Sequence, residues 1–327
     1  MAAAARLWLS PTAQPPSPRR TTDMTLKIGV CGTAFWAEHV HLPGLAATDG
    51  IELVGLWGRS PEPAARLADK TGVTAFPSFE ALLDTVDALS FAVPPEVQSR
   101  LAPLAIARGR HVILEKPLGD SIDSALAIRR AITAAGVTGL CFLTRMFVPE
   151  IAAFLDRARA LDPREGRAEF RSNALGAGPY AASPWRQAQY GALHDAAPHG
   201  MSVLVSALGP VREAAGRMEP DGAFTLSFRH EGGQSSTLLL NLRDASVQLA
   251  ESYQFRNGSS VDLPGLSYDR KATFARAAAT LRDTVAGRPD AGDTQLDLAL
   301  HLVCVAAAAQ QSLESGGDFV PVATPQP

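Results

Sequence analysis

Short apolar runs alternate with helical stretches through the first half of the chain, and this rhythm constrains the fold more than any other sequence feature. The runs are rich in Val, Ile, Leu and Phe and have the length of strands that are buried on both faces. Strands that alternate with helices at this spacing predict a doubly wound parallel sheet of the α/β class. The predicted strands are Leu26–Cys31, Ile51–Trp57, a short one near Ala75, Ala88–Val93, His111–Leu114 and Val137–Leu143, and the predicted helices include Pro61–Thr71, 95–108 and Ser121–Ala135.

The rhythm changes from Arg145 onward, where alternating strands and hairpin signals take over. Several antiparallel strands with helices to one side predict a second domain of the α+β class. We therefore divide the chain into two domains, 24–144 and 145–322. The predicted elements of the second domain are a helix at Pro149–Leu161, a strand at Arg167–Asn173, a hairpin of Phe224–Arg229 and Ser236–Leu242 around Gly232-Gly233, a strand at Val247–Phe255, and helices at Thr273–Ala286 and Thr294–Ser315.

Residues 1–23 stand apart from both predicted domains. They are rich in Ala and then in Pro, Ser and Thr, and their apolar run is too short and too interrupted by Pro for a signal peptide. This composition predicts disorder. Met24 opens MTLKIGV, a natural first strand, so the tail is a candidate overextended start.

Composition and charge exclude several classes of protein. The formal net charge of −3 gives no electrostatic case for binding nucleic acid or an anionic membrane, and no apolar run predicts a membrane span. Cys31, Cys141 and Cys304 lie far apart without metal-ligand spacing, so we interpret them as buried thiols in a reducing, cytoplasmic compartment. No Ser-His-Asp order, acidic dyad or metal-ligand cluster stands out, so neither a hydrolase nor a metal site is predicted.

The turn after the first predicted strand is the place for a dinucleotide-binding fingerprint, G-x-G-x-x-G/A. Gly32 and Ala37 fill its first and third positions, and Ala34 stands where the second glycine belongs. The alternative is an ordinary strand-to-helix turn. On the fingerprint interpretation the loop binds the cofactor through Gly32, Thr33, Ala34, Phe35 and Trp36.

The end of the second strand bears on which dinucleotide is bound. An NAD site calls for Asp or Glu there, whereas this strand runs into Gly58-Arg59-Ser60. A guanidinium and a hydroxyl suit a 2′-phosphate, which favours NADP over NAD. The alternatives are a solvated Arg59 or one that lies flat on adenine.

The segment Glu115-Lys116-Pro117 ends the predicted strand at 111–114 with two charges. Ligands of parallel α/β sheets lie at the carboxyl ends of strands, where Lys116 is expected. Burying two charges costs desolvation energy, which suggests a chemical purpose. The alternative is a surface ion pair.

Asp195-Ala196-Ala197-Pro198-His199 enters an apolar helix that stops at Gly209-Pro210. Residues four apart face the same way on a helix, so the Asp195 carboxylate and the His199 imidazole are expected one turn apart. Such a pair suits proton transfer. The alternative makes Asp195 a helix N-cap with Pro198 in the first turn. The other histidines, including His39 and His41 in the first helix, are interpreted as packing or surface residues.

The segments GVCGTAFWAEHVHLPGL, DALSFAVPPEVQ, GRHVILEKPLG and LTRMFVP together resemble the glucose–fructose oxidoreductase / inositol dehydrogenase (Gfo/Idh/MocA) family. The resemblance runs from about Lys27 to the C-terminus. It implies a Rossmann domain followed by a domain with a large, mostly antiparallel open sheet, through which homodimers or homotetramers form. It also implies that Lys116 lies beside the nicotinamide and the reacting hydroxyl, opposite a catalytic Asp195 and His199.

This sequence departs from the family pattern at four positions. Pro95 and Gln98 replace the Asn and His of P-N-x-x-H, Ala197 replaces the Gly of D-x-G-x-H, and Ser202 replaces an acidic residue often found three after the His. The further cofactor contacts that we expect are Arg59, Ser60, Pro94, Pro95, Gln98, Glu115, Lys116 and Arg186.

The sequence thus predicts an NAD(P)-dependent oxidoreductase that moves hydride to or from a hydroxyl or carbonyl carbon of a sugar, polyol or related diol. Lys116 stabilises the reacting oxygen, His199 is the general acid/base and Asp195 orients it, although Lys116 could take the proton instead. Arg145 and Tyr180 are further candidate substrate contacts. The alternative function is a catalytically silent NADP-binding sensor or scaffold on the same fold.

Overall fold

The computed structural model describes residues 25–178, 180–288 and 292–326, so the predicted disorder of residues 1–23 lies outside the described residues. The chain forms two compact units. The first contains the chain up to Phe142 and also Asp269–Asp297, a segment that the division at residue 144 assigns to the second domain. The second contains Leu143–Tyr268 and Leu298–Gln326.

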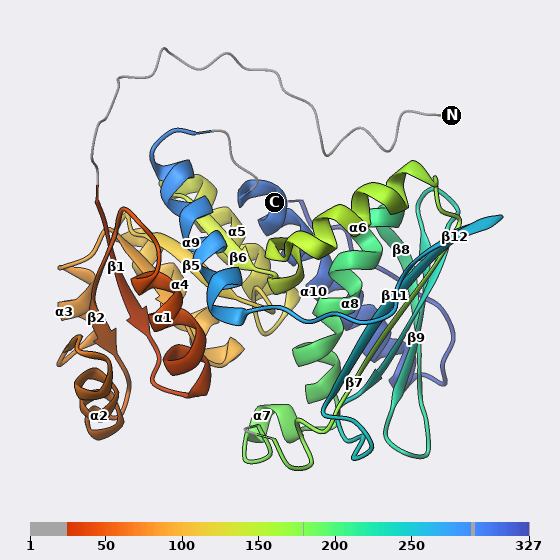
Figure 1. The fold of residues 1–327 in the computed structure, drawn as a ribbon, viewed down its shortest axis with the longest axis horizontal. Coiled ribbons are helices and arrows are strands. Elements are labelled where there is room, and N and C mark those ends of the chain that lie inside the picture. Colours follow the sequence, from red (N-terminus) through yellow and green to blue (C-terminus); the bar gives the residue numbers. More distant parts are fainter. Residues whose placement is uncertain (1–24, 179, 289–291, 327) are drawn as a thin grey trace. The chain divides into compact units, whose positions relative to one another are not determined.

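A six-stranded sheet organises the first unit, with strand order β3-β2-β1-β4-β5-β6 (Figure 1). All of its neighbouring strands pair in parallel, which confirms the predicted doubly wound sheet. The order reverses between β1 and β4, and in such sheets the ligand crevice lies at that point, outside the carboxyl ends of the strands. The strands are β1 Leu26–Cys31, β2 Ile51–Trp57, β3 Thr74–Ala75, β4 Ala88–Phe91, β5 His111–Glu115 and β6 Gly139–Phe142.

The helices of the first unit follow the predicted spacing with two differences. The first helical stretch opens as a π-helix, η2 (Ala37–His41), before α1 (Leu42–Ala46), and a short helix α3 (Phe79–Leu83) was not predicted. Ser121 caps α5 by accepting a hydrogen bond from the Ser124 N–H. The remaining helices are α2 Pro61–Thr71, α4 Pro95–Ala107, α5 Ile122–Ala135 and α9 Arg270–Val285.

A seven-stranded open sheet organises the second unit, with order β12-β11-β7-β10-β9-β8-β13 (Figure 1). Only β7 and β10 pair in parallel among these neighbours, so the predicted mostly antiparallel sheet is confirmed. The strands are β7 Glu165–Ser172, β8 Val211–Met218, β9 Phe224–His230, β10 Ser235–Asn241, β11 Leu249–Asn257, β12 Ser259–Leu263 and β13 Val320–Pro321.

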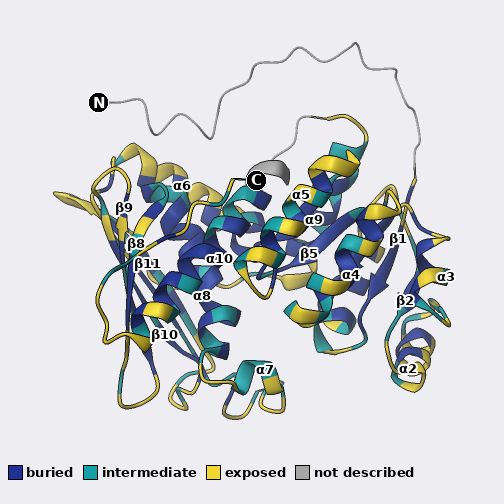
Figure 2. Ribbon diagram, turned by 180° about the vertical axis from the view of Figure 1, so that it is seen from behind, coloured by how far each residue is buried: buried dark blue, intermediate teal, exposed yellow. Residues whose placement is uncertain are grey.

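Helix α8 (Gly191–Leu208) packs on β7 and β10 and is largely buried (Figure 2). A Cβ on Gly200 would lie 2.6 Å from Leu238 Cδ1, so glycine permits the close approach of helix and sheet. The helix begins before Asp195, with Pro198 in its interior, so the alternative that made Asp195 an N-cap is wrong. The other helices are η3 Thr144–Phe147, α6 Pro149–Ala160, α7 Pro184–Gln187 and α10 Gly292–Glu314, which begins in the first unit and continues into the second.

Within the described residues, Gln295–Glu314 of α10 is long and apolar enough to cross a membrane by length and composition alone. Of its most apolar window, 61% is buried inside the structure, as expected for a core helix. This is weak evidence for a membrane span.

Candidate active site

The turn after β1 has the backbone that a dinucleotide fingerprint requires. Gly32 has a φ of +135°, and a Cβ there would lie 2.3 Å from the carbonyl oxygen of Ala92. Only glycine fits this position without displacing the backbone after β4. A Cβ on Gly58 would likewise lie 2.4 Å from Thr33 Cγ2, so the loops after β1 and β2 meet closely. The residues present therefore fit a dinucleotide at the switch point of the sheet.

Arg59 and Ser60 lie between β2 and α2. Ser60 is the N-cap residue of α2, but its side chain makes no capping hydrogen bond, and both side chains are exposed. A helix N-terminus with a guanidinium beside it suits an anion. This position is compatible with the predicted contact to a 2′-phosphate.

Glu115, the last residue of β5, has a buried and fully occupied carboxylate. Its Oε1 accepts hydrogen bonds from Trp36 Nε1, just before η2, and from His41 Nε2 at 3.0 Å, while Oε2 accepts from the Lys116 N–H. The other nitrogen of His41, Nδ1, lies 2.8 Å from the Ser90 hydroxyl on β4. This network connects three segments of the first unit: the stretch from Trp36 to His41, strand β4 and the end of β5.

Gln98 on α4 holds the backbone around Lys116. Its side chain is 1% exposed and makes hydrogen bonds to main-chain groups of Glu115, Pro117 and Leu118. Gln98 was predicted as a cofactor contact, and its hydrogen bonds to the main chain were not predicted. The cofactor contact stays a prediction, whereas the hydrogen bonds to the backbone are observed.

Arg186 on α7 holds Asp195 on α8 within the second unit. Its Nε donates a hydrogen bond to Asp195 Oδ2 at 2.9 Å. The guanidinium carbon lies 4.3 Å from the ring centroid of Tyr180 and 4.3 Å from that of Trp185, so the cation is stacked against two aromatic rings. Three residues that we predicted separately, Tyr180, Arg186 and Asp195, therefore belong to one cluster.

His199, one turn after Asp195, stacks on Phe170 of β7, with ring centroids 5.8 Å apart. The guanidinium of Arg145 also lies over the Phe170 ring, 5.5 Å from its centroid. Phe170 therefore supports both a predicted catalytic side chain and the buried Arg145. This role of Phe170 could not be predicted from the sequence, because the alternation along the strand indicates only that the side chain faces inward.

Arg145 lies in a buried network rather than at a surface. Its Nε and NH2 donate to both carboxylate oxygens of Glu251, and its NH1 donates to the Tyr268 hydroxyl. Burial alone would lower the pKa of Arg145, but the charge of Glu251 raises it above its ordinary value. Burial raises the pKa of Tyr253, which donates to the same carboxylate. The guanidinium of Arg145 is thus committed to protein partners.

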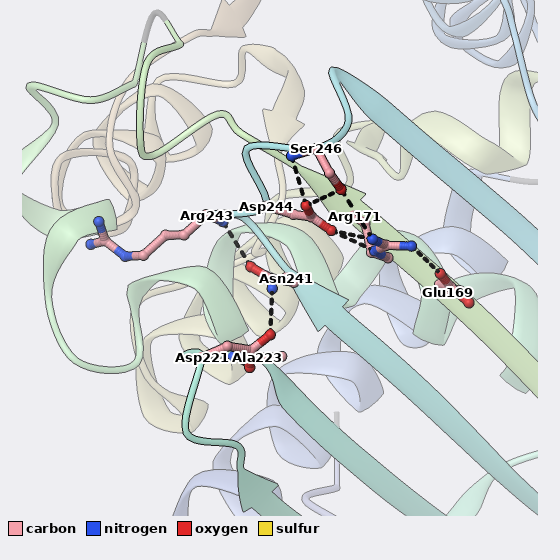
Figure 3. Close-up of polar contacts among 8 residues, drawn as sticks. All are labelled: Glu169, Arg171, Asp221, Ala223, Asn241, Arg243, Asp244 and Ser246. Carbon is pink, nitrogen blue, oxygen red and sulfur yellow. Dashed lines mark hydrogen bonds and ion pairs between the residues drawn. The ribbon is translucent and has the colours of Figure 1, made fainter.

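The face of the large sheet that α8 leaves uncovered carries a shallow hollow of about 490 Å³. Figure 3 shows its polar groups paired among themselves, with Arg171 bound to Asp244 and Asn241 bound to Asp221. None of the predicted site residues lines this hollow. In the described part of the chain, no group of three or more His, Cys, Asp or Glu side chains could hold a metal ion.

Comparison with known proteins bears on the first unit above all. Residues 26–143 match the oxidoreductase family with an NAD-binding Rossmann fold, Gfo/Idh/MocA. Two curated relatives are dTDP-3,4-didehydro-2,6-dideoxy-alpha-D-glucose 3-reductase of Streptomyces antibioticus, 39% identical over 105 residues, and UDP-N-acetylglucosamine 3-dehydrogenase of Acidithiobacillus ferrooxidans, 35% identical over 103 residues. Each alignment covers 32% of this chain, and the chain spans only 30% and 32% of the respective relative.

The fold as a whole matches solved structures over nearly its full length. GenD2 from gentamicin A biosynthesis, solved in complex with NAD, superimposes with a TM-score of 0.81 at 19% identity. That match covers 95% of this chain and 100% of GenD2, and at this identity it shows the shared fold alone. The family match confirms, over residues 26–143, the resemblance to the Gfo/Idh/MocA oxidoreductases that was predicted from the sequence.

Proposed function

We propose that this chain is an NAD(P)-dependent oxidoreductase that transfers hydride between a nicotinamide and a hydroxyl or carbonyl carbon of a sugar, polyol or related diol. The observation that carries the proposal is Lys116, a cation at the carboxyl end of β5 in a sheet whose first turn fits a dinucleotide. The names of the relatives, a nucleotide-sugar reductase and a nucleotide-sugar dehydrogenase, support a sugar substrate.

In the proposed reaction the bound nicotinamide supplies the hydride chemistry, and the protein orients the substrate and moves one proton. Lys116 donates a hydrogen bond to the reacting oxygen and stabilises its negative charge. His199 takes or returns the proton, and Asp195 orients the imidazole. Arg186 and Tyr180 hold Asp195 in place, so we assign them to support of the site. Arg145, whose guanidinium is occupied by Glu251 and Tyr268, is not retained as a substrate contact.

For the cofactor, we propose NADP in preference to NAD, since Arg59 and Ser60 stand at the N-terminus of α2 where a carboxylate would serve NAD. Arg59→Ala is expected to weaken NADPH binding about tenfold and leave NADH binding within about twofold, by titration of cofactor fluorescence. Equal losses for both cofactors would contradict the preference.

For assembly, we propose a homodimer or homotetramer formed through the face of the large sheet that α8 leaves uncovered. That face carries Arg167, Glu169 and Arg171 in alternate positions of β7, a mixture of charges that a second copy can complement. Sedimentation of the purified chain tests the assembly. A cytoplasmic location fits the three buried cysteines, which form no disulfide.

The proposed activity is tested with a panel of sugars, polyols, diols and their keto forms, using NADP and NAD and the absorbance of the reduced cofactor. Lys116→Ala and His199→Ala are each expected to lower turnover about 100-fold and to leave cofactor binding intact. Wild-type rates in both variants would refute the assigned roles. Cofactor binding without turnover on any member of the panel would favour a silent sensor or scaffold.

A further inference from the structure

Gln98 is a buried amide whose two ends are both used, and every partner lies on the main chain that carries Lys116. Its Oε1 accepts the Glu115 N–H at 2.8 Å. Its Nε2 donates to the Glu115 carbonyl at 2.8 Å and faces those of Pro117 and Leu118 at 3.2 Å each. A buried amide is favourable only when these bonds are made, so position 98 is committed to one backbone geometry around residue 116.

The Glu115 main chain that Gln98 binds has no strand partner on the side of β4, although β6 still pairs with β5 there, with Phe142 opposite Glu115. Strand β4 pairs with β5 only as far as Ser90 opposite Ile113, although β5 continues to Glu115. The Gln98 amide offers a donor and an acceptor side by side, as a peptide group does, and so continues the ladder where β4 has ended. Without it, the Glu115 N–H and C=O would be buried with fewer partners next to Lys116.

We propose that Gln98 is a positioning residue for Lys116: it fixes the end of β5, so that the lysine side chain starts from one defined backbone position. The catalytic consequence rests on the proposed function, because the position of Lys116 affects turnover only in an oxidoreductase. Gln98 itself does not touch the reacting atoms in this role.

The first test needs no substrate. Hydrogen exchange is followed in the full chain for wild type and Gln98→Met, a variant of similar shape that can neither accept nor donate as the amide does. We expect the peptide covering 111–118 to exchange about tenfold faster in Gln98→Met, with β6 unchanged. The matched control is Ser99→Ala at the next position of α4, which removes the hydrogen bonds of the Ser99 hydroxyl with the Asp120 N–H and carboxylate and none to residues 111–118. Unchanged exchange at 111–118 in Gln98→Met would overturn the proposal.

The second test measures turnover per NADPH-binding site, with sites counted by fluorescence titration. Gln98→Met is expected to lower kcat per site about tenfold, and Ser99→Ala to match wild type. Gln98→Glu should recover activity relative to wild type as the pH falls, because only a protonated carboxyl group can both donate and accept here. A merely structural role would reduce the number of sites and leave kcat per site and its pH profile unchanged.

The outcomes separate the two proposals. Normal kcat per site in Gln98→Met, in an active wild-type enzyme, overturns the positioning role and leaves the proposed function intact. Wild-type protein that binds NADPH but turns over no member of the panel overturns the proposed function and, with it, the catalytic consequence of Gln98. The exchange result then stands alone as evidence that Gln98 holds the strand end.

Discussion

The two predicted catalytic regions are fixed by different interactions. The main chain at Lys116 is held from within the first unit, by the fully buried amide of Gln98 and by the carboxylate of Glu115 with His41. Asp195 is held by Arg186, whose side chain is 21% exposed and stacks on rings of the segment before α8. Buried hydrogen bonds are costly to break, whereas a partly exposed ion pair contributes little to stability. The difference indicates that the end of β5 before Lys116 is rigid. The ion pair that holds Asp195, in contrast, can break at a small cost in free energy.

The second unit also contains a buried ion pair, but this pair does not include the predicted catalytic histidine. Arg145 and Glu251 form a nearly inaccessible ion pair, and both that guanidinium and the His199 ring pack against Phe170. The histidine is thus supported by packing on an anchored aromatic ring. If this contrast is real, substitutions at the buried partners should lower the free energy of unfolding more than a substitution at the partly exposed Arg186.

The largest effect is expected from Arg145→Met. The substitution leaves the Glu251 carboxylate buried without its cation, which typically costs about 3–5 kcal/mol of the free energy of unfolding. Urea unfolding of the full chain, followed by tryptophan fluorescence, measures the loss. The double variant Arg145→Met/Glu251→Met removes both charges and should recover most of it. A loss below about 1 kcal/mol in the single variant would show that water or a neighbour replaces the guanidinium.

A smaller effect is expected from acid, and it should fall mainly on the second unit. Burial lowers the pKa of His301 to about 4, and its Nε2 accepts the Val211 N–H, which a protonated ring could not do. Because the unfolded chain binds this proton near pH 6.5, stability is complete above that pH and is lost as the pH falls toward 4. The loss is about 1.4 kcal/mol per pH unit for one group in this window.

His301→Gln removes this titration and should flatten the stability curve between pH 6.5 and 4, measured by urea unfolding at each pH. The matched variant in the first unit is His111→Gln, since His111 Nδ1 accepts the Thr138 N–H and burial lowers the pKa of this residue too. If both variants flattened the curve of stability against pH equally, the two units would not differ in their sensitivity to acid.

The third prediction concerns the Glu115 carboxylate of the first unit. Glu115→Gln keeps the shape but carries a donor, so its NH2 group must face either the Trp36 and His41 donors or the Lys116 N–H. A donor facing a donor in a buried site costs about 1–2 kcal/mol of the free energy of unfolding, measured by urea denaturation. The exposed Glu80→Gln on α3 is the control and should stay within about 0.5 kcal/mol of wild type. A neutral result at Glu115 would show that the site does not depend on an acceptor at both oxygens of this side chain.

Sequence patterns predicted the scaffold well because strand and helix signals are local. The bounds of β1, β2 and α2 agree with prediction, since each is a short periodic run bounded by glycine, proline or a polar cap. The elements that were not predicted include some with weak local signals: α3 is about one turn long, and β8 has no clean alternation of buried and exposed residues. The alternative that started α8 at Asp195 was wrong, because Pro198 suggested a first turn whereas the proline lies inside the helix.

The support of the site could not be predicted in the same way. Gln98 and Glu115 are 17 residues apart, His41 and Glu115 are 74 apart, and Arg145 and Glu251 are 106 apart. Spacing rules for one helix or strand contain no information on such partners. The π-helix η2 is a further example: it ends at His41 and buries both Val40 and His41, whereas the sequence predicted one continuous helix. One signal was available, because Gln98 stands where the family pattern has a histidine.

The smallest effect on stability, and the one that most sharpens the comparison, is expected from Arg186→Met. The ion pair with Asp195 is partly exposed, so its loss should change the free energy of unfolding by less than about 1 kcal/mol. Under the proposed function, kcat should still fall about tenfold, because an unheld Asp195 no longer fixes the His199 ring. Arg186→Lys keeps the charge but not the planar group that stacks on Tyr180 and Trp185, so its kcat should lie between those of Arg186→Met and wild type.

The measurements are urea unfolding and turnover per NADPH-binding site on the same samples. If stability fell as far as in Arg145→Met, or if kcat were unchanged, then the Arg186 cluster would be a structural anchor like the ion pair of Arg145 and Glu251, and the contrast between the two catalytic regions would disappear.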